Sequence, residues 1–246
     1  QIPVRLYMGD GEDVVVYSGS VLDSELDSVI YGGAGGDYIE SQSTRPIAIY
    51  GEDGDDYIVI SGVSAGAATI VGGNGNDKIF GGRSGDTIYG DSNTNNVDSG
   101  DDEITGGGGA DTIYGGSGSD QVNLGFDGFG STVNLTGDTG NQRDFLVITG
   151  TSDDDNIHIE KGAVSGDVRV RVTNAAGVDI GSIVGSDADS LVLFTGFGSD
   201  HTTVHELQGA GVQDVAVNFG KQVSVIGTTE IEEAFDHDDD DTTPDQ

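Results

Sequence analysis

The sequence predicts an all-β fold, a parallel β-roll that continues into a degenerate β-solenoid or a small β-domain. Two observations predict this fold. A nine-residue phrase, GGxGxDxUx with U a large apolar residue, occurs four times without a fault, at 32–40, 72–80, 106–114 and 115–123. The last two copies abut, so the phrase is a repeat, and self-similarity at a fixed period is the signature of a repeat architecture.

Each place in the phrase has a physical role in a turn that is followed by a strand. Glycine permits positive φ and a close approach of neighbouring backbones, which turns loop carbonyl oxygens toward one point. The aspartate at the sixth place adds an anionic oxygen there, and the apolar residue at the eighth place packs on its equivalents in neighbouring coils. The glycines predicted to offer carbonyl ligands are Gly33, Gly35, Gly73, Gly75, Gly107, Gly109, Gly116 and Gly118.

Weaker copies keep the aspartate and a loop glycine, and they lie at 8–16, 51–59, 81–89, 97–105, 139–147, 150–158 and 195–203. The copy at 195–203 is the weakest, because Thr202 stands at its eighth place. The candidate metal ligands at the sixth place are Asp13, Asp37, Asp56, Asp77, Asp86, Asp102, Asp111, Asp120, Asp144 and Asp155. Hard cations take roughly six to eight oxygens from carboxylates and carbonyls, so the predicted cofactor is calcium, as several ions.

Composition excludes several classes of partner and of site. The chain has 246 residues, with 44 acidic residues against 9 basic ones and a formal net charge of −35. This charge repels nucleic acid and anionic membrane surfaces. The absence of cysteine removes disulfides, thiolate metal sites and cysteine nucleophiles, and no apolar run has the length of a membrane span. The predicted partner is therefore calcium, with no nucleic acid and no membrane insertion.

Over roughly residues 8–123, and more loosely to 158, the sequence resembles the RTX family of calcium-binding nonapeptide repeats. The resemblance implies that two nonapeptides form one coil and that each ion lies between successive turns on one edge. Alternate repeats then share an edge, which brings together Asp13, Asp37, Asp56, Asp77, Asp102 and Asp120 at steps of 24, 19, 21, 25 and 18 residues. At a spacing of about 4.8 Å, six rungs give a row on the order of 24 Å long.

The half-coils on the opposite edge differ in sequence. The segments SGSVLDSELDSVIY, SQSTRPIAIY and SGVSAGAATIV keep the final strand but lose the glycine and aspartate turn. Only 81–89 and 106–114 keep it. We therefore expect an asymmetric roll, with a continuous calcium row on one edge and one or two ions on the other. The polar stretch GDSNTNNVDSGDDEIT predicts a surface loop inserted into one coil.

From Leu124 onward the repeat is diluted. The segments STVNLTG, RDFLVITG, NIHIEKG, DVRVRVTN, SLVLFTG and DVAVNFG alternate in the manner of half-buried strands. They either continue the solenoid or form a separate β-domain, and the aspartate turns at 150–158 and 195–203 favour continuation. We predict a calcium-binding β-roll over 1–135, a degenerate β-solenoid or β-rich extension over 136–232, and an acidic tail or linker over 233–246.

Other chemistry has little support in the sequence. The string GVSAG at 62–66 fits a serine-hydrolase pattern but lacks the strand, sharp turn and helix that this pattern requires. His201 and His205 lie four residues apart and face one way on a strand, which fits a transition-metal pair or, as the favoured interpretation, a surface pair. His158 and His237 have no obvious partner in the sequence, and no catalytic residues are predicted.

The family resemblance implies an extracellular calcium-binding module, structural or adhesive, within a larger secreted or cell-surface bacterial protein. It implies a chain that is exported by a type I system and folds outside the cell when calcium binds. Extracellular polysaccharide or neighbouring surface-protein chains are the expected further partners. Two alternatives are an appendage of an exoenzyme that aids secretion and substrate capture, and a subunit of a calcium-bridged surface layer or filament.

Overall fold

The fold is a two-sheet β-solenoid, and its coordinates come from a computed structural model. The structure describes residues 4–18, 28–62, 66–91, 100–135, 142–174, 176–205, 207–218 and 223–225. Within these ranges every regular element is a strand, apart from one 3-10 turn, η1 (Phe126–Gly128). The predicted inserted loop falls largely on 92–99, GVSAG falls largely on 63–65, and the predicted acidic tail at 233–246 follows the last described strand. These segments lie outside the described residues.

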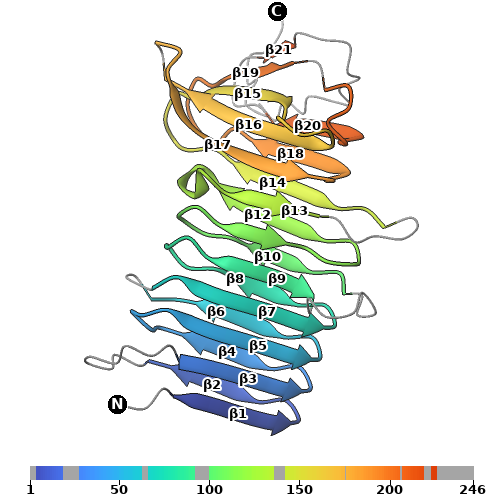
Figure 1. The fold of residues 1–246 in the computed structure, drawn as a ribbon. Coiled ribbons are helices and arrows are strands. Elements are labelled where there is room, and N and C mark those ends of the chain that lie inside the picture. The colour runs from blue at the N-terminus through green and yellow to red at the C-terminus, as the bar shows by residue number, and fades with distance from the viewer. Residues whose placement is uncertain are drawn as a thin grey trace, which may run out of the picture.

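The strands form two sheets that face one another along the length of the molecule (Figure 1). Sheet A has twelve strands, in the spatial order β1 (Arg5–Asp10), β3 (Ser28–Ala34), β5 (Ile47–Asp53), β7 (Ala68–Asn74), β9 (Thr87–Asp91), β11 (Thr112–Tyr114), β13 (Thr132–Asn134), β17 (Asp179–Ser186), β16 (Asp167–Thr173), β15 (Asn156–Lys161), β19 (His201–Val204) and β21 (Val223–Val225). Sheet B has nine, in the order β2 (Val14–Tyr17), β4 (Tyr38–Ser41), β6 (Tyr57–Ile60), β8 (Lys78–Phe80), β10 (Glu103–Thr105), β12 (Gln121–Gly125), β14 (Phe145–Thr149), β18 (Ser190–Phe194) and β20 (Asp214–Asn218).

From β1 to β14 the chain alternates between the sheets, so that two strands make one coil. Each strand pairs in parallel with the strand two positions along the chain, and the eighth-place residues stand in register: Ile39 beside Ile58, Ile58 beside Ile79, and Ile79 beside Ile104. We call the row of turns that lead from sheet A to sheet B the first edge, and the row of turns that lead back the second edge. The predicted parallel β-roll is confirmed over these coils.

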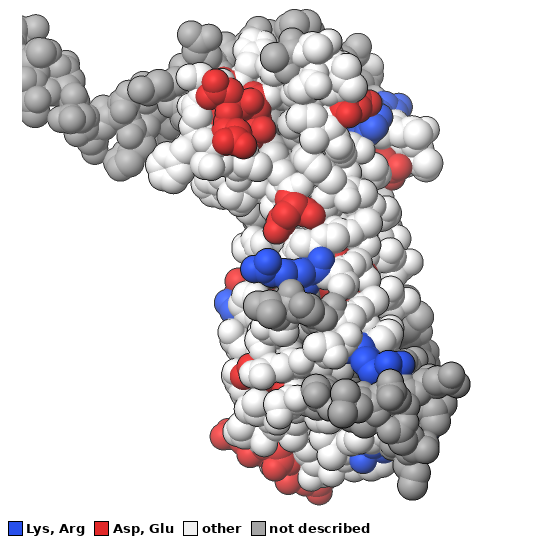
Figure 2. Space-filling model, turned by 90° about the vertical axis from the view of Figure 1, so that its left-hand side faces the viewer, with Lys and Arg blue, Asp and Glu red and all other residues white. Residues whose placement is uncertain are grey.

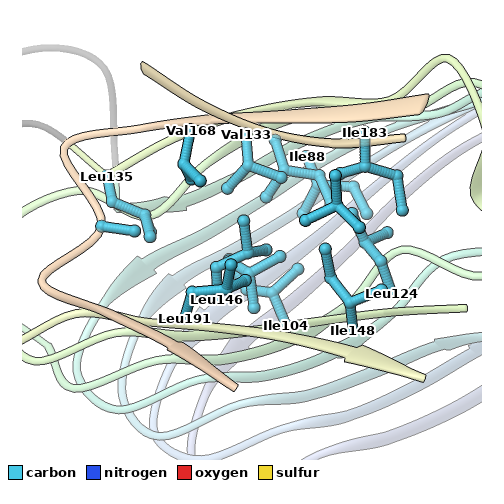
Figure 3. Packing of buried hydrophobic residues seen from close by; sticks show 14 of the residues in the cluster. Ile88, Ile104, Leu124, Val133, Leu135, Leu146, Ile148, Val168, Ile183 and Leu191 are labelled. Carbon is cyan, nitrogen blue, oxygen red and sulfur yellow. The ribbon is translucent and has the colours of Figure 1, made fainter. Parts of the chain in front are cut away.

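The core lies between the sheets as stacked columns of aliphatic side chains. Ile30, Ile49, Ile70, Ile88 and Ile113 line its sheet A side, and all are fully buried. Figure 3 shows the next part of the core, where Val133 and Ile183 lie opposite Leu146 and Ile148. Identical side chains at one rung spacing bury apolar surface along the whole length, and the period of two along each strand points the intervening residues outward.

The C-terminal part keeps the two sheets but changes its path. β17 pairs in parallel with β13, and β18 pairs in parallel with β14, so both sheets continue past the regular coils. Between β14 and β18 the chain forms an antiparallel meander, in which β16 pairs with β15 on one side and with β17 on the other. Sequence alternation predicts these half-buried strands but not their direction, and the antiparallel pairs differ from the parallel pairing of the regular coils.

Candidate metal sites along the turns

The aspartates at the sixth place form one continuous buried row along the first edge. Asp37, Asp56, Asp77, Asp102, Asp120 and Asp144 are all buried, and Asp13 is half-buried at the start of the row. The backbone N–H of each aspartate donates to Oδ1 of the aspartate in the next rung, from Asp13 to Asp37 at 2.8 Å through to Asp120 to Asp144 at 2.8 Å. The predicted order and steps of the row are therefore the observed ones.

The second carboxylate oxygen has a different environment. Among the described residues, Oδ2 is buried and accepts no hydrogen bond in Asp13, Asp37, Asp56, Asp77, Asp102, Asp111 and Asp200. A buried polar atom without a partner costs free energy, and a row of them calls for a ligand. In Asp37, Asp56, Asp77 and Asp102 the carboxylate thus joins two rungs through Oδ1 and leaves Oδ2 available.

The available oxygen faces a backbone carbonyl across a space that only glycine leaves open. A Cβ placed on Gly32 would lie 2.5 Å from Asp37 Oδ2 and 2.6 Å from the carbonyl oxygen of Gly51 in the next rung. The same pairing of a carboxylate Oδ2 with the next rung's glycine carbonyl surrounds one glycine at the start of the turn in four further turns: Gly51, Gly72, Gly90 and, on the second edge, Gly81. The turns therefore bring carboxylate and carbonyl oxygens from adjacent rungs to one point.

The glycines predicted to offer carbonyl oxygens as metal ligands all adopt the left-handed conformation, with φ between 92° and 138°. Gly33 illustrates the reason, because a Cβ at this residue would collide with the carbonyl of Gly9 in the preceding rung. At Gly35 a Cβ would lie 2.5 Å from the carbonyl oxygen of Gly11. These glycines let successive turns stack closely and set the direction of their carbonyls.

Burial has a strong effect on the carboxyl groups of the row. Desolvation, with repulsion from neighbouring aspartates, raises the pKa of Asp56 to about 6, of Asp77 to about 8 and of Asp102 to about 9. On the second edge the same causes raise the pKa of Asp111 to about 7. The pKa rises most in the middle of the row, where carboxylates lie both before and after each group. Without a cation these side chains either hold protons or destabilise the stacked turns.

The second edge carries fewer such turns. Asp86 and Asp111 form a short ladder, in which the N–H groups of Ala68 and Asp86 donate to the next Oδ1, and Ser131 Oγ takes over as acceptor for Asp111. Asp86 Oδ2 accepts the N–H of Gly82 at 2.7 Å, so both of its oxygens are satisfied by the protein. Basic residues, Arg45 and Arg83, stand in the turns of this edge. Figure 2 views this edge and shows basic side chains between its acidic patches.

The aspartates of the C-terminal part divide between the two edges. Asp144 continues the first-edge row and donates its N–H to Asp189 Oδ2, whose Oδ1 accepts the side-chain amide of Gln213. Asp155 lies on the second edge, and its N–H donates to Asp200 Oδ1 in the neighbouring coil. Thr151 donates to Asp155 Oδ2 through both its N–H and its hydroxyl. The structure thus joins the windows at 150–158 and 195–203, and it adds Asp189, which the repeat pattern missed.

A second ladder, at the exposed fifth place, was also missed. Asp55 Oδ1 accepts the N–H of Asn76, Asn76 Oδ1 accepts the N–H of Asp101, and Asp101 Oδ1 accepts the N–H of Ser119. The fifth place is variable in the repeat, and only its short polar character could have signalled this role. The ladder joins first-edge turns through side chains that lie outside the metal positions.

The chemistry of the turns fits a hard cation. No three His, Cys, Asp or Glu side chains converge within the described ranges, so a metal in a turn has one or two carboxylates and otherwise backbone carbonyls. Calcium accepts such oxygen sets in flexible geometry, whereas magnesium demands near-ideal octahedra and zinc prefers nitrogen and sulfur. The residues that would hold calcium are the sixth-place aspartates, with the carbonyls of the loop glycines.

Comparison with known families supports this interpretation. The model of the RTX calcium-binding nonapeptide repeat matches four segments, residues 27–43, 48–59, 64–97 and 96–127. No curated protein matches the chain. Repeats of this family bind several calcium ions. No helix in the described part of the chain is both long and apolar enough to cross a membrane.

Proposed function

We propose that this chain is a calcium-switched structural or adhesive module of a larger secreted or cell-surface bacterial protein. Its residues 27–127 belong to the RTX family of calcium-binding nonapeptide repeats. Calcium binding and a place among secreted proteins are general properties of the repeat. The finer statements are that this chain folds when calcium binds, that it leaves the cell by a type I route, and that its role outside the cell is mechanical or adhesive and not catalytic.

One observation carries the proposal: a row of buried carboxylate oxygens that face glycine carbonyls and have no hydrogen-bond donor in the described structure. Each such oxygen has lost its water and gained no partner, so the stacked row opposes folding at neutral pH. A cation that bridges a carboxylate to the carbonyl of the next rung makes the row favour folding instead. Because the bridge needs two stacked rungs, binding free energy becomes folding free energy.

The concentration of calcium is the natural control of such a module. At low calcium the glycine-rich backbone and the repelling aspartates favour the unfolded chain. At the higher calcium concentration outside cells the ions join rung to rung, and burial of the aliphatic columns then stabilises the fold further. The chain therefore remains unfolded during export and becomes rigid afterwards.

The outer face of sheet A offers support for an adhesive role. Tyr7, Tyr31 and Tyr50 stack with ring centroids 4.7 and 5.1 Å apart. Beside this ladder lies an open groove of about 440 Å³, lined among others by Tyr7, Glu52 and Asp53. Aromatic rings with a few polar groups in a shallow groove suit a hydroxylated ligand such as a polysaccharide. Neighbouring surface-protein chains are the other partners that we propose.

The test is far-ultraviolet circular dichroism of the chain during a calcium titration, with magnesium at equal ionic strength as the control for charge screening. We expect a cooperative coil-to-β transition with calcium alone. A chain that is fully folded in chelator, or one that folds equally well with magnesium, would contradict the proposed switch. Sedimentation at several protein concentrations in calcium separates a monomeric module from a layer or filament subunit.

A further inference from the structure

Two histidines on the outer face of sheet A lie next to one another in the C-terminal part. His158 is on β15, and His205 directly follows β19, the strand that pairs in parallel with β15. Their rings are stacked, with centroids 5.7 Å apart and an interplanar angle of 25°. The sequence had suggested His205 with His201, but His201 is exposed, and the structure pairs His205 with His158 instead.

Both rings have a buried nitrogen without a hydrogen-bond partner. Within the described residues, His158 Nδ1 and His205 Nε2 are inaccessible to solvent and make no hydrogen bond. Native structures rarely leave such atoms unsatisfied, and where they do, the common explanations are a water or an ion. Two unsatisfied nitrogens on adjacent rings suggest one shared ligand.

The other nitrogen of His158 has a partner of the kind that metal-bound histidines have. His158 Nε2 lies 3.3 Å from the hydroxyl oxygen of Thr173, a buried residue on β16. The tautomer with its hydrogen on Nε2 donates to this hydroxyl and leaves the lone pair of Nδ1 for a ligand. Such outer hydrogen bonds hold the ring and its tautomer in place at metal sites.

The local charges do not prevent a cation from binding. Arg171 is opposite His158 in the strand register, and its guanidinium bonds to Glu160 at 3.2 Å and to Asp179 at 2.6 Å. Arg169 also contacts Glu160, at 3.5 Å. The two arginines are thus paired with two carboxylates, and the local charge is close to neutral.

We propose that His158 and His205 bind a divalent transition-metal ion, such as copper or zinc, at a site that is separate from the calcium turns and differs from them in its donor atoms. With metal–nitrogen bonds of about 2.0–2.1 Å, two imidazoles on one ion place their ring centres about 5 to 6 Å apart. The observed separation of 5.7 Å falls in this range, and because each lone pair lies in its ring plane, one of the two stacked rings turns about its Cβ–Cγ bond when both nitrogens bind the ion. No third His, Cys, Asp or Glu side chain converges on the pair in the described structure, so water completes the coordination. Imidazole nitrogen favours copper and zinc over calcium.

The experiment uses the tag-free chain in saturating calcium, which occupies the oxygen sites, and titrates copper(II) or zinc by calorimetry in a non-coordinating buffer. We expect one equivalent of copper and nitrogen hyperfine structure from two nitrogens in its electron paramagnetic resonance spectrum. His158→Gln and His205→Gln should each lower the affinity tenfold or more. Thr173→Val should lower it by a smaller factor, because it removes only the hydroxyl that positions His158.

His201→Gln is the matched control, since it removes an exposed histidine four residues from His205 and should leave the affinity unchanged. The calcium-dependent circular dichroism of every variant is recorded first, so that a loss of fold is recognised. The proposal is overturned if the wild-type chain binds no equivalent of copper or zinc in calcium. It is also overturned if His201→Gln weakens binding as much as His158→Gln does, because the metal would then be held by surface histidines in general.

Discussion

Asp77→Asn should make the calcium-free chain more stable while removing calcium from the row. Asp77 is 2% exposed, its Oδ1 accepts the N–H of Asp56 at 2.9 Å, and its Oδ2 has no hydrogen-bond donor among the described residues. Asparagine keeps the Oδ1 acceptor and replaces Oδ2 with an amide group next to the carbonyl of Gly90, which can accept its hydrogen bond. The variant therefore removes a buried charge without removing the link between the rungs.

The magnitude follows from the raised pKa. Burial raises the pKa of Asp77 from 3.8 to about 8, so this carboxyl stabilises the folded chain below its unfolded pKa and that stability is lost as the pH rises toward 8. At pH 7.5 the calcium-free chain has lost up to about 5 kcal/mol at this one residue, at about 1.4 kcal/mol per pH unit. Relaxation of the turn lowers this figure, and we expect Asp77→Asn to recover about 2 to 5 kcal/mol of unfolding free energy, extrapolated to zero calcium.

Chemical denaturation at a series of fixed calcium concentrations measures both effects. The slope of unfolding free energy against the logarithm of calcium concentration counts the ions bound on folding, and we expect it to fall by one or two ions in Asp77→Asn. The control is Asp55→Asn, which makes the same charge change at an exposed side chain that accepts a hydrogen bond from Asn76. If the unfolding free energy extrapolated to zero calcium is lower in Asp77→Asn than in wild type, or if its slope equals that of Asp55→Asn, the assignment of Asp77 as a calcium ligand is wrong.

Three further outcomes are expected. Calcium affinity should fall more in Asp77→Ala than in Asp86→Ala, because Asp86 Oδ2 already accepts the N–H of Gly82; equal losses by calorimetry would count against an asymmetric roll. Glu52→Gly should raise the thermal midpoint in calcium by relieving about 1 kcal/mol of strain, since Glu52 has a φ of 80°. Gly33→Ala should lower the thermal midpoint sharply, because Gly33 has a φ of 119° and lies against the carbonyl of Gly9. Opposite shifts would refute the stacking argument. The stability of the calcium-free fold should decrease from pH 4 to pH 9 as Asp56, Asp111, Asp77 and Asp102 ionise through folded pKa values of about 6, 7, 8 and 9. Calcium binding near pH 7 should release protons, which calorimetry in buffers of different ionisation enthalpy measures. A stability that is constant over this pH range would refute the role of burial.

The regular coils could be predicted from the sequence because the repeat encodes turn, strand and register within nine residues. Ile39, Ile58 and Ile79 occupy equivalent places, so their stacking follows from the period alone. The antiparallel meander could not be predicted in this way, because a strand such as β16 alternates equally well in a parallel or an antiparallel sheet. Its direction is a consequence of tertiary pairing with β15 and β17.

Contacts between distant parts of the chain could not be predicted from the sequence for the same reason. Asp189 follows Asp144 in the row although 45 residues separate them, and no fixed spacing connects the two. His158 and His205 come together only because β19 pairs directly with β15, the outer strand of the inserted meander. The repeat predicts where a carboxylate lies, but whether its second oxygen has a protein donor depends on these long-range contacts.

That second oxygen decides how far the calcium row extends. In Asp77 and Asp102 the described structure offers Oδ2 no donor, so this oxygen takes either a proton or a cation. At Asp189 the amide of Gln213 donates to one oxygen and the N–H of Asp144 to the other, while at Asp155 Thr151 supplies two donors. A carboxylate that the protein already satisfies gains less from calcium, because the ion must replace existing hydrogen bonds. We therefore expect the C-terminal coils to hold their fold at lower calcium than the regular coils require, and hydrogen exchange along a calcium titration should show protection of β18 before protection of β6. Protection that appears first in β6 would place the strongest calcium dependence at the wrong end of the roll.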